Sequence, residues 1–214
     1  MAEKSNRVSR FAAHAMSKQQ QILDVASAYF QTFGYDGSSI SAMARDSGIS
    51  KESIYRYFKG KNALFMAVID QELVQYKVKI THLVDDSISA DLRQSLVNIA
   101  GTLLSLLMND HQQAVRRLVF NEVRRSPEIG RYYHEIGPAL AYENLEKFFS
   151  SVREETQFSP RNLSRYFMAL VLHELMLERS CGVRENPTAD EINEIVGPIV
   201  DDFLKAYFNG RHYG

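Results

Sequence analysis

The sequence predicts an all-α protein, in which a three-helix unit with a helix-turn-helix is followed by a larger helical domain. Apolar residues recur at helical spacing along nearly all of the 214 residues, and no stretch alternates as a half-buried strand does. Serine, threonine and glycine stand where helices are expected to begin and end. We place the domain boundary after residue 62, which gives domains over 1–62 and 63–214.

The first expected helix begins at Ser17 and ends at Gly34. Ser17 followed by Gln20 matches the capping box, in which two side chains satisfy amides at a helix start. Gly34 fits the glycine that ends many helices in the left-handed conformation. Residues 1–16 carry three basic side chains but no apolar stretch of signal-peptide length, so we interpret them as an arm.

Two short helices are expected next, over about 40–47 and 51–57. Their predicted N-caps are Ser39 and Ser50, because serine hydroxyls accept hydrogen bonds from the free amides of a first turn. Gly48 lies between the helices, where a tight turn needs a positive φ.

The remaining chain is expected to form longer helices, separated by short loops. Gly137 and Pro138 should kink or split one of them, because proline has no amide hydrogen. Thr188, with Glu191 three residues later, is the expected cap of the last. The expected ranges are about 61–82, 90–108, 111–125, 127–153, 160–181 and 189–208.

The last two expected helices are apolar over most of their circumference. A helix that is buried on most sides needs neighbours on most sides. These helices favour a homodimer, in which they pack as a four-helix bundle across a two-fold axis. Burial within a single chain is the alternative. The residues expected at the dimer interface are Phe167, Val171, Ile195, Ile199 and Phe203.

Charge is distributed unevenly along the chain, although the net charge is only −1. Residues 1–62 hold nine basic and five acidic side chains, a net charge of +4, and the remainder is acidic. A basic N-terminal quarter indicates an anionic partner for that quarter, with chance fluctuation as the alternative.

Residues 40–58 fit a helix-turn-helix. Ala44 is small where two helices would cross, and Gly48 follows four residues later at the turn. Ile49 and Ile54 have the spacing that fills the core between the helices. In DNA-binding proteins with this layout, the second helix enters the major groove.

The stretch ILDVASAYFQTFGYDGSSISAMARDSGISKESIYRYFKGKNALFMAVI resembles the N-terminal domain of the TetR family of bacterial transcriptional regulators. Glu52 stands where that family often has glycine. The resemblance implies a homodimer that binds a palindromic operator in double-stranded DNA. It also implies that a small-molecule effector enters the C-terminal domain and shifts the spacing of the two DNA-binding heads.

The second helix of the motif supplies most of the candidate DNA contacts. Lys51 can reach a base edge or a phosphate from the helix start, and Arg56 can read guanine. Glu52 and Ser53 are candidates for base edges, with solvent exposure as the alternative for Glu52. Hydroxyl and ammonium groups are expected at the DNA backbone. The full set is Ser39, Ser41, Lys51, Glu52, Ser53, Tyr55, Arg56, Tyr57 and Lys61.

Further alternatives stay open for this set. Tyr55 can instead pack against the first helix. The basic arm, with Lys4, Arg7 and Arg10, either orders in the minor groove or is a disordered terminus.

The larger domain is expected to contain an apolar pocket with a few polar groups that orient the effector. The candidates are polar or aromatic residues on otherwise apolar helix faces. For each of them a purely structural role, such as an ion pair between neighbouring helices, is the alternative. The set is Arg117, Asn121, His134, Tyr142, Phe149, Phe167 and His173.

An enzyme is not expected, and no cofactor or metal is predicted. The segment that begins at His173 fails the zinc motif His-Glu-x-x-His, because Leu177 occupies the second histidine position. A helical metal-dependent enzyme is therefore the weakest alternative. A nucleoid or cell-division factor controlled by a protein partner is the other.

The chain has no apolar run long enough to span a membrane, so no membrane partner is expected. A single cysteine suits a reducing compartment. We therefore expect the protein in the cytoplasm.

Overall fold

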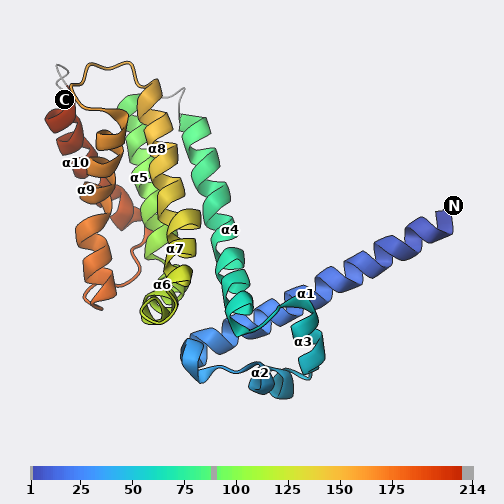
Figure 1. Cartoon of the computed structure of the whole chain (residues 1–214). Coiled ribbons are helices and arrows are strands. Elements are labelled where there is room, and N and C mark those ends of the chain that lie inside the picture. The colour runs from blue at the N-terminus through green and yellow to red at the C-terminus, as the bar shows by residue number, and fades with distance from the viewer. Residues whose placement is uncertain (1, 88–90, 209–214) are drawn as a thin grey trace. The chain divides into compact units, whose positions relative to one another are not determined.

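The computed structural model describes residues 2–87 and 91–208, and within these ranges the chain is helical, without a strand (Figure 1). The expectation of an all-α fold is confirmed. Two compact units can be separated. Unit 1 comprises Met1–Glu72 and Arg117–Gly130, and unit 2 comprises Leu73–Arg116 and Arg131–Gly214. No helix of the described residues is long and apolar enough to cross a membrane.

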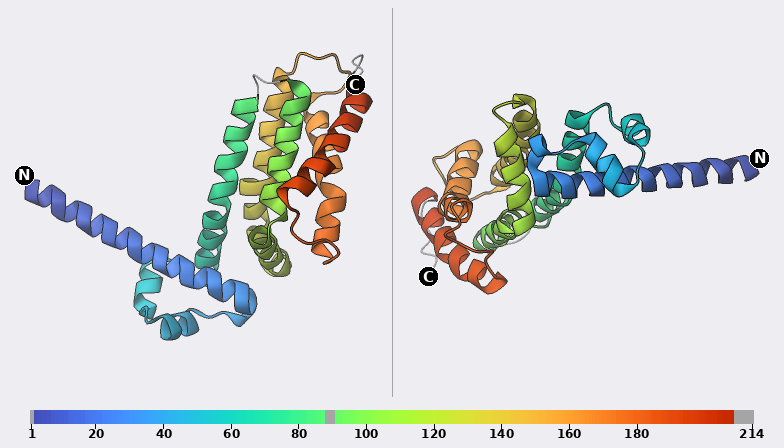
Figure 2. Two further views of the ribbon diagram at one scale, coloured as in Figure 1. Left: turned by 180° about the vertical axis from the view of Figure 1, so that it is seen from behind. Right: turned by 90° about the horizontal axis from the view of Figure 1, so that it is seen from below.

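Helix α1 (Ala2–Gly37) is longer than the sequence predicted. The expected start at Ser17 is wrong, because the helix begins at Ala2 and continues through this position (Figure 2). Between Ala2 and Phe33 there is no glycine or proline to stop it, and a serine within a helix costs only a few tenths of a kcal/mol. Instead of capping, the Gln20 side chain donates hydrogen bonds to Asp24 at 2.8 Å and Gln71 at 3.0 Å.

The glycine that was predicted to end the first helix is instead a kink, after which the helix continues to Gly37. Gly34 leaves the helical conformation, with φ 69° and ψ 177°. Ser38 follows it, and its hydroxyl donates a hydrogen bond of 2.7 Å to the Gly34 carbonyl. The left-handed φ is one that glycine adopts without steric cost.

Helices α2 (Ile40–Ser47) and α3 (Lys51–Tyr57) form the predicted helix-turn-helix. The hydroxyl of Ser39 accepts the amide of Ala42 at 3.1 Å, and that of Ser50 accepts the amide of Ser53 at 3.1 Å, so both predicted N-caps are confirmed. Gly48 adopts the left-handed conformation between the two helices, as expected.

The core of unit 1 is formed by apolar side chains from each of its helices. Ile49 and Ile54 are buried between α2 and α3. The rings of Phe30 in α1 and Phe65 in α4 meet edge to face, with centroids 4.9 Å apart. Leu118, Val119 and Ile129, which lie 45 residues or more beyond this region in the sequence, are also buried and belong to unit 1.

The remaining elements are mostly those expected. The bounds are α4 (Lys61–Ser87), α5 (Leu92–Met108), α6 (Asp110–Glu122), α7 (Pro127–His134), α8 (Leu140–Ser151), α9 (Pro160–Ser180) and α10 (Ala189–Tyr207). The predicted break at Gly137 and Pro138 is a single π-helical turn, η1 (Glu135–Ala139). The predicted capping box of Thr188 and Glu191 at the start of α10 is confirmed.

Unit 2 is a helical bundle in which α8 packs on α9 and α10 packs on α5 (Figures 1 and 2). Arg93 of α5 and Asp201 of α10 form a paired contact of 2.7 and 3.1 Å across that packing. Because the Arg93 guanidinium donates to it, the pKa of Asp201 lies below its ordinary value. The bundle core is aromatic at one end, as described below.

Candidate nucleic-acid interface and effector unit

Helix α3 presents a polar face away from the core of unit 1. Ile54 is its buried anchor, at 1% exposure. Lys51 and Tyr55 are exposed one turn apart on this helix, and the Lys51 ammonium is 5.9 Å from the Tyr55 ring centroid. Glu52 and Arg56 form the neighbouring exposed pair. The outward face therefore carries two cations, one carboxylate and one phenol.

The other residues expected at DNA lie around this face. Ser39 and Ser41 are exposed at the start of α2, where free helix amides favour an anion. The hydroxyl of Ser39 already caps its own helix. Ser53 and Tyr57 are half-buried on α3, and the Arg56 guanidinium lies 5.3 Å from the Tyr57 ring centroid.

Lys61 differs from the exposed lysine of α3, because its ammonium is engaged inside unit 1. It donates a hydrogen bond of 3.0 Å to the Ser38 carbonyl and lies 4.2 Å from the Tyr35 ring centroid. Burial lowers the pKa of Lys61, and the nearby Glu122 carboxylate opposes that shift. Lys61 thus ties the start of α4 to the chain just before α2.

A polar contact that the sequence did not predict fixes α2 against α1. The Tyr29 hydroxyl donates to Asp46 and also lies 3.3 Å from the Ala42 carbonyl. Arg45 donates to the same carboxylate at 2.6 Å. Through the hydrogen bond from Arg45, and then that from Tyr29, the pKa of Asp46 lies below its ordinary value.

The segment after α6 also joins unit 1 through polar contacts. Arg125 pairs with Asp36 near the end of α1. The side-chain amide of Asn62, at the start of α4, donates to Glu128 at 3.1 Å. These partners are separated by more than 60 residues, so no local sequence signal could have identified them.

Glu122, at the end of α6, is a carboxylate with only 4% exposure. The Ser126 hydroxyl donates to it at 3.3 Å. Burial, and then the charge of Glu122, raises the pKa of the Tyr35 phenol, and the same charge opposes the lowering of the Lys61 pKa. The sequence showed only an acidic residue within an apolar stretch and did not indicate its burial.

The structure separates the residues expected at an effector into three groups. Phe149 and Phe167 are buried and meet Phe203 at ring-centroid distances of 5.8 and 5.1 Å, so these rings fill one another's space. Arg117 and Asn121 are exposed in the part of α6 that belongs to unit 1. Phe149 and Phe167 therefore belong to the core of unit 2, and Arg117 and Asn121 belong to the surface of unit 1. His173 is likewise exposed, on α9, and His134 and Tyr142 form the third group.

His134 and Tyr142 share a surface groove of about 390 Å³ between α8 and α9. Its size falls at the lower end of the range for small-molecule sites. Two guanidinium groups, of Arg161 and Arg165, line the α9 side. Ala139, Glu143, Glu146 and Ser164 complete the lining. The sequence did not single out the two arginines, which stand one helical turn apart.

The residues expected at the dimer interface fall into a buried group and a half-exposed group. Phe167, Val171 and Phe203 are buried within unit 2 and form part of its own core. Ile195 and Ile199 are half-exposed on α10.

Large apolar side chains are exposed on α9 at two positions that the sequence did not single out. Leu170 is 47% exposed and Leu177 is 58% exposed. They are seven residues apart, so they lie on one face of the helix.

Within the described ranges, no three histidine, cysteine or acidic side chains gather as metal ligands. A polar group without a partner does occur in the interior of unit 2. Asn144 on α8 is 8% exposed, and its side-chain nitrogen has no hydrogen-bond acceptor among the described residues.

Two protein families match the chain. Residues 22–68 match the family described as "Bacterial regulatory proteins, tetR family". Residues 94–209 match the family described as "AefR-like transcriptional repressor, C-terminal domain". The second match covers more than half of the chain.

Relatives agree with these matches. The HTH-type transcriptional repressor Rv1474c of Mycobacterium tuberculosis is 22% identical over 174 residues, which are 79% of this chain and 86% of that protein. A TetR-family regulator structure from Mesorhizobium loti MAFF303099 superposes with a TM-score of 0.81 at 24% identity, over 91% of this chain and 98% of that one, and shows the same fold. The flavonoid-responsive regulator FrrA gives a TM-score of 0.74 at 26% identity, over 91% and 99%.

Proposed function

The chain belongs to the TetR family of bacterial transcriptional regulators, and on that premise we propose that it is a repressor released from DNA by a small molecule. In this proposal a homodimer binds a palindromic operator through unit 1, and the effector binds in unit 2. Such a repressor acts in the cytoplasm, where bacterial DNA lies.

The observation that carries the proposal is the outward face of α3. Lys51, Tyr55 and Arg56 are exposed there, while Ile54 anchors the helix in the core. A helix held in this way can enter the major groove with its polar face toward the base edges. Arg56 would read guanine, and Lys51 and Tyr55 would contact the backbone or a base edge.

Four further residues are proposed as secondary DNA contacts: Ser39, Ser41, Ser53 and Tyr57. Ser39 and Ser41 would contact phosphate at the start of α2, where helix amides point outward. Ser53 and Tyr57 are half-buried on α3, so they can reach DNA only at the edge of the contact. Lys61 supports the interface from behind, because its ammonium is engaged by Ser38 and Tyr35.

The homodimer is proposed through α9 and α10. Leu170 and Leu177 expose large apolar surface on one face of α9. Ile195 and Ile199, one turn apart on α10, are half-exposed. Apolar patches of this kind on a surface mark interaction sites, and a two-fold axis would bring each patch onto its own copy. Two heads would then reach half-sites about one helical turn of DNA apart.

The effector is proposed at the groove that holds His134 and Tyr142. Arg161 and Arg165 give its α9 side positive charge, and the tyrosine ring offers an aromatic surface. The similar protein FrrA is named as flavonoid-responsive. We propose an aromatic, weakly acidic small molecule of that class as the first effector to test.

Selection of bound duplexes from a randomised DNA library tests the proposal. The expected result is an inverted repeat whose half-sites lie about 10 base pairs apart. Arg56→Ala should lose the selected duplex, while Arg153→Ala, which removes the same charge from the α8–α9 loop, should retain it. Naringenin, a flavonoid, should release the duplex. A consensus without two-fold symmetry would contradict the proposed dimer, and equal loss in both variants would contradict the role of α3.

A further inference from the structure

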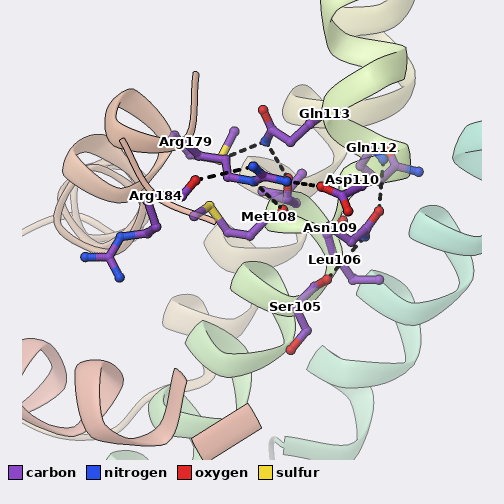
Figure 3. Close-up of polar contacts among 11 residues, drawn as sticks. Ser105, Leu106, Met108, Asn109, Asp110, Gln112, Gln113, Arg179 and Arg184 are labelled. Atoms are coloured by element: carbon purple, nitrogen blue, oxygen red, sulfur yellow. Dashed lines mark hydrogen bonds and ion pairs between the residues drawn. The ribbon is translucent and has the colours of Figure 1, made fainter. Parts of the chain in front are cut away.

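Arg179, in the last turn of α9, joins three segments of unit 2 (Figure 3). Its side chain is only 14% exposed. One guanidinium nitrogen donates to the Met108 carbonyl at the end of α5, at 3.1 Å, and another to the Arg184 carbonyl in the α9–α10 loop, at 3.3 Å. The third pairs with Asp110, the first residue of α6.

The α5–α6 turn that Arg179 contacts is itself well fixed. The Asn109 side chain donates to the Leu106 carbonyl at 2.7 Å and accepts the amide of Gln112 at 2.9 Å (Figure 3). The Gln113 side chain donates to the Leu107 carbonyl at 2.7 Å. These side chains satisfy the end of α5 and the start of α6, so the turn moves as one piece with the first residues of α6.

Only an arginine can make the three contacts at once. A planar guanidinium carries five donors in a fixed fork, whereas a lysine ammonium is a compact point charge. The three acceptors belong to three segments: the end of α5, the first residue of α6 and the α9–α10 loop. Removal of Arg179 therefore removes its contacts from the end of α9 to α5 and to the first residue of α6. Gln113 and Met176 at 3.7 Å, and Arg116 and Ser180 at 3.2 Å, still join α6 to α9.

Helix α6 continues from this fixed point out of unit 2 and into unit 1. Its first part, up to Arg116, belongs to unit 2, and from Arg117 it belongs to unit 1. Beyond its last turn, the pairs Arg125–Asp36 and Glu128–Asn62 hold the chain to the helices of unit 1. A continuous helix is stiff along its axis, so a displacement at its start is carried to its end.

We propose that Arg179 is a positioning residue that fixes the start of α6 to the end of α9, and that through it unit 2 and the DNA-binding unit influence each other. The inference rests on the proposed function, in which binding in unit 2 controls binding to DNA. Helix α9 also carries Arg161 and Arg165 of the groove and Leu170 of the proposed dimer face. Arg179 thus connects α9, which carries part of the proposed effector groove and of the proposed dimer face, to α6, which enters unit 1.

The influence must be reciprocal, because a coupling free energy acts in both directions. DNA itself can therefore serve as the probe, and no effector is needed. Amide hydrogen exchange of the full-length protein is followed by mass spectrometry, with and without the selected duplex. In the wild type, the duplex should slow exchange at residues 110–116 by about fivefold, the lower end of typical allosteric coupling factors. In Arg179→Gln this slowing should vanish, while the change at α3 remains.

Two further variants make the test specific. Arg184→Gln is the matched control, because the Arg184 side chain pairs only with Glu178 at 2.6 Å among the described residues and reaches neither α5 nor α6. It should behave as the wild type. Asp110→Asn removes the charge that Arg179 meets on α6, at a side chain that is 85% exposed, so it avoids a folding defect. It should reduce the slowing at residues 110–116 by at least half of the wild-type effect.

The outcomes separate the inference from the proposed function. If no duplex is selected, the proposed function fails and the inference falls with it. If the duplex binds and its effect at residues 110–116 persists in Arg179→Gln and Asp110→Asn, the inference alone is overturned. If Arg179→Gln does not fold, Asp110→Asn alone decides the question. Equal loss in Arg184→Gln would show that the whole cluster has only a structural role.

Discussion

Replacement of Lys61 by methionine tests how the DNA-binding unit is held together. The change keeps the length of the side chain and removes its charge. In the wild type the ammonium donates to the Ser38 carbonyl at 3.0 Å and lies over the Tyr35 ring at 4.2 Å. Ser38 stands two residues before α2, so Lys61 connects the start of α4 to the start of the helix-turn-helix.

The expected loss of stability follows from these two contacts. A hydrogen bond from a charged donor contributes about 1.5 to 3 kcal/mol, and a cation over an aromatic ring about 0.5 to 1 kcal/mol. Burial opposes both, as the lowered pKa of Lys61 shows. We expect Lys61→Met to lower the free energy of unfolding by about 1 to 3 kcal/mol. Because the chain has no tryptophan, urea unfolding is followed by far-ultraviolet circular dichroism.

The salt dependence of DNA binding gives the decisive comparison. Lys51 is exposed and, among the described residues, its ammonium contacts only the Tyr55 ring. Loss of one phosphate contact reduces the slope of log K against log salt concentration by about 0.9. We expect this reduction for Lys51→Met and none for Lys61→Met. An equal reduction in both variants, with full stability in Lys61→Met, would refute the engaged role of Lys61 and place its ammonium at a phosphate.

Four further predictions follow from single contacts. Arg56→Ala should weaken binding to the selected duplex by about 1 to 3 kcal/mol, measured by fluorescence anisotropy. Ile199→Asp should yield monomers by light scattering, because it buries a charge at the proposed dimer face. Asn144→Leu should raise the free energy of unfolding by about 1 kcal/mol, since it removes a buried nitrogen that lacks an acceptor among the described residues. Thr188→Ala should lower it by about 1 kcal/mol at pH 7. Hydrogen bonds from the Thr188 amide and hydroxyl lower the pKa of Glu191, and the variant keeps the amide bond but loses the hydroxyl one. The stability from the hydroxyl–carboxylate bond is complete above the ordinary pKa and is lost as pH falls through the lowered one, so the effect of the variant should be smaller in acid.

Each of these has a result that would contradict it. Unchanged affinity in Arg56→Ala would remove that side chain from base recognition. A dimeric Ile199→Asp protein would place the interface elsewhere. A destabilised Asn144→Leu protein would show that the amide has a partner, such as bound water. A Thr188→Ala effect that is the same at pH 7 and in acid would show that the hydrogen bond from the hydroxyl to the Glu191 carboxylate does not contribute to stability.

Most helix ends of the fold could be predicted because their causes are local. Three caps, Ser39, Ser50 and Thr188, each accept from an amide three residues away, and Gly48 turns the chain through its own φ. The start of α1 could not be predicted in the same way. Ser17 has the residue type of a cap, but a capping residue acts only where the preceding chain is not helical. The residues before Ser17 contain neither glycine nor proline after Met1, and the helix continues through them.

The contacts of the second half of α6 could not be predicted because they are distant in sequence. Apolar spacing can indicate that a helix has an apolar face, but it cannot show which surface that face meets. Unit 1 includes Arg117–Gly130, and Glu122 is buried there. Arg179 is similar, since an arginine in the last turn of a helix suits the helix dipole by itself. Its three acceptors arise only in the folded chain.

The groove between α8 and α9 depends on the helix break at Pro138, whose effect on neighbouring side chains could not be predicted from the sequence. Pro138 predicted a break in the helix, and in the structure this break is the π-helical turn Glu135–Ala139. In an uninterrupted α-helix, His134 and Tyr142 would be eight residues and about 80° apart around the axis, at about 100° per residue. A π turn adds one residue, so the pair behaves as if seven apart and comes to lie within about 20° on the same face. Both side chains thereby line one groove, together with Ala139 of η1 and with Glu143 and Glu146 of α8.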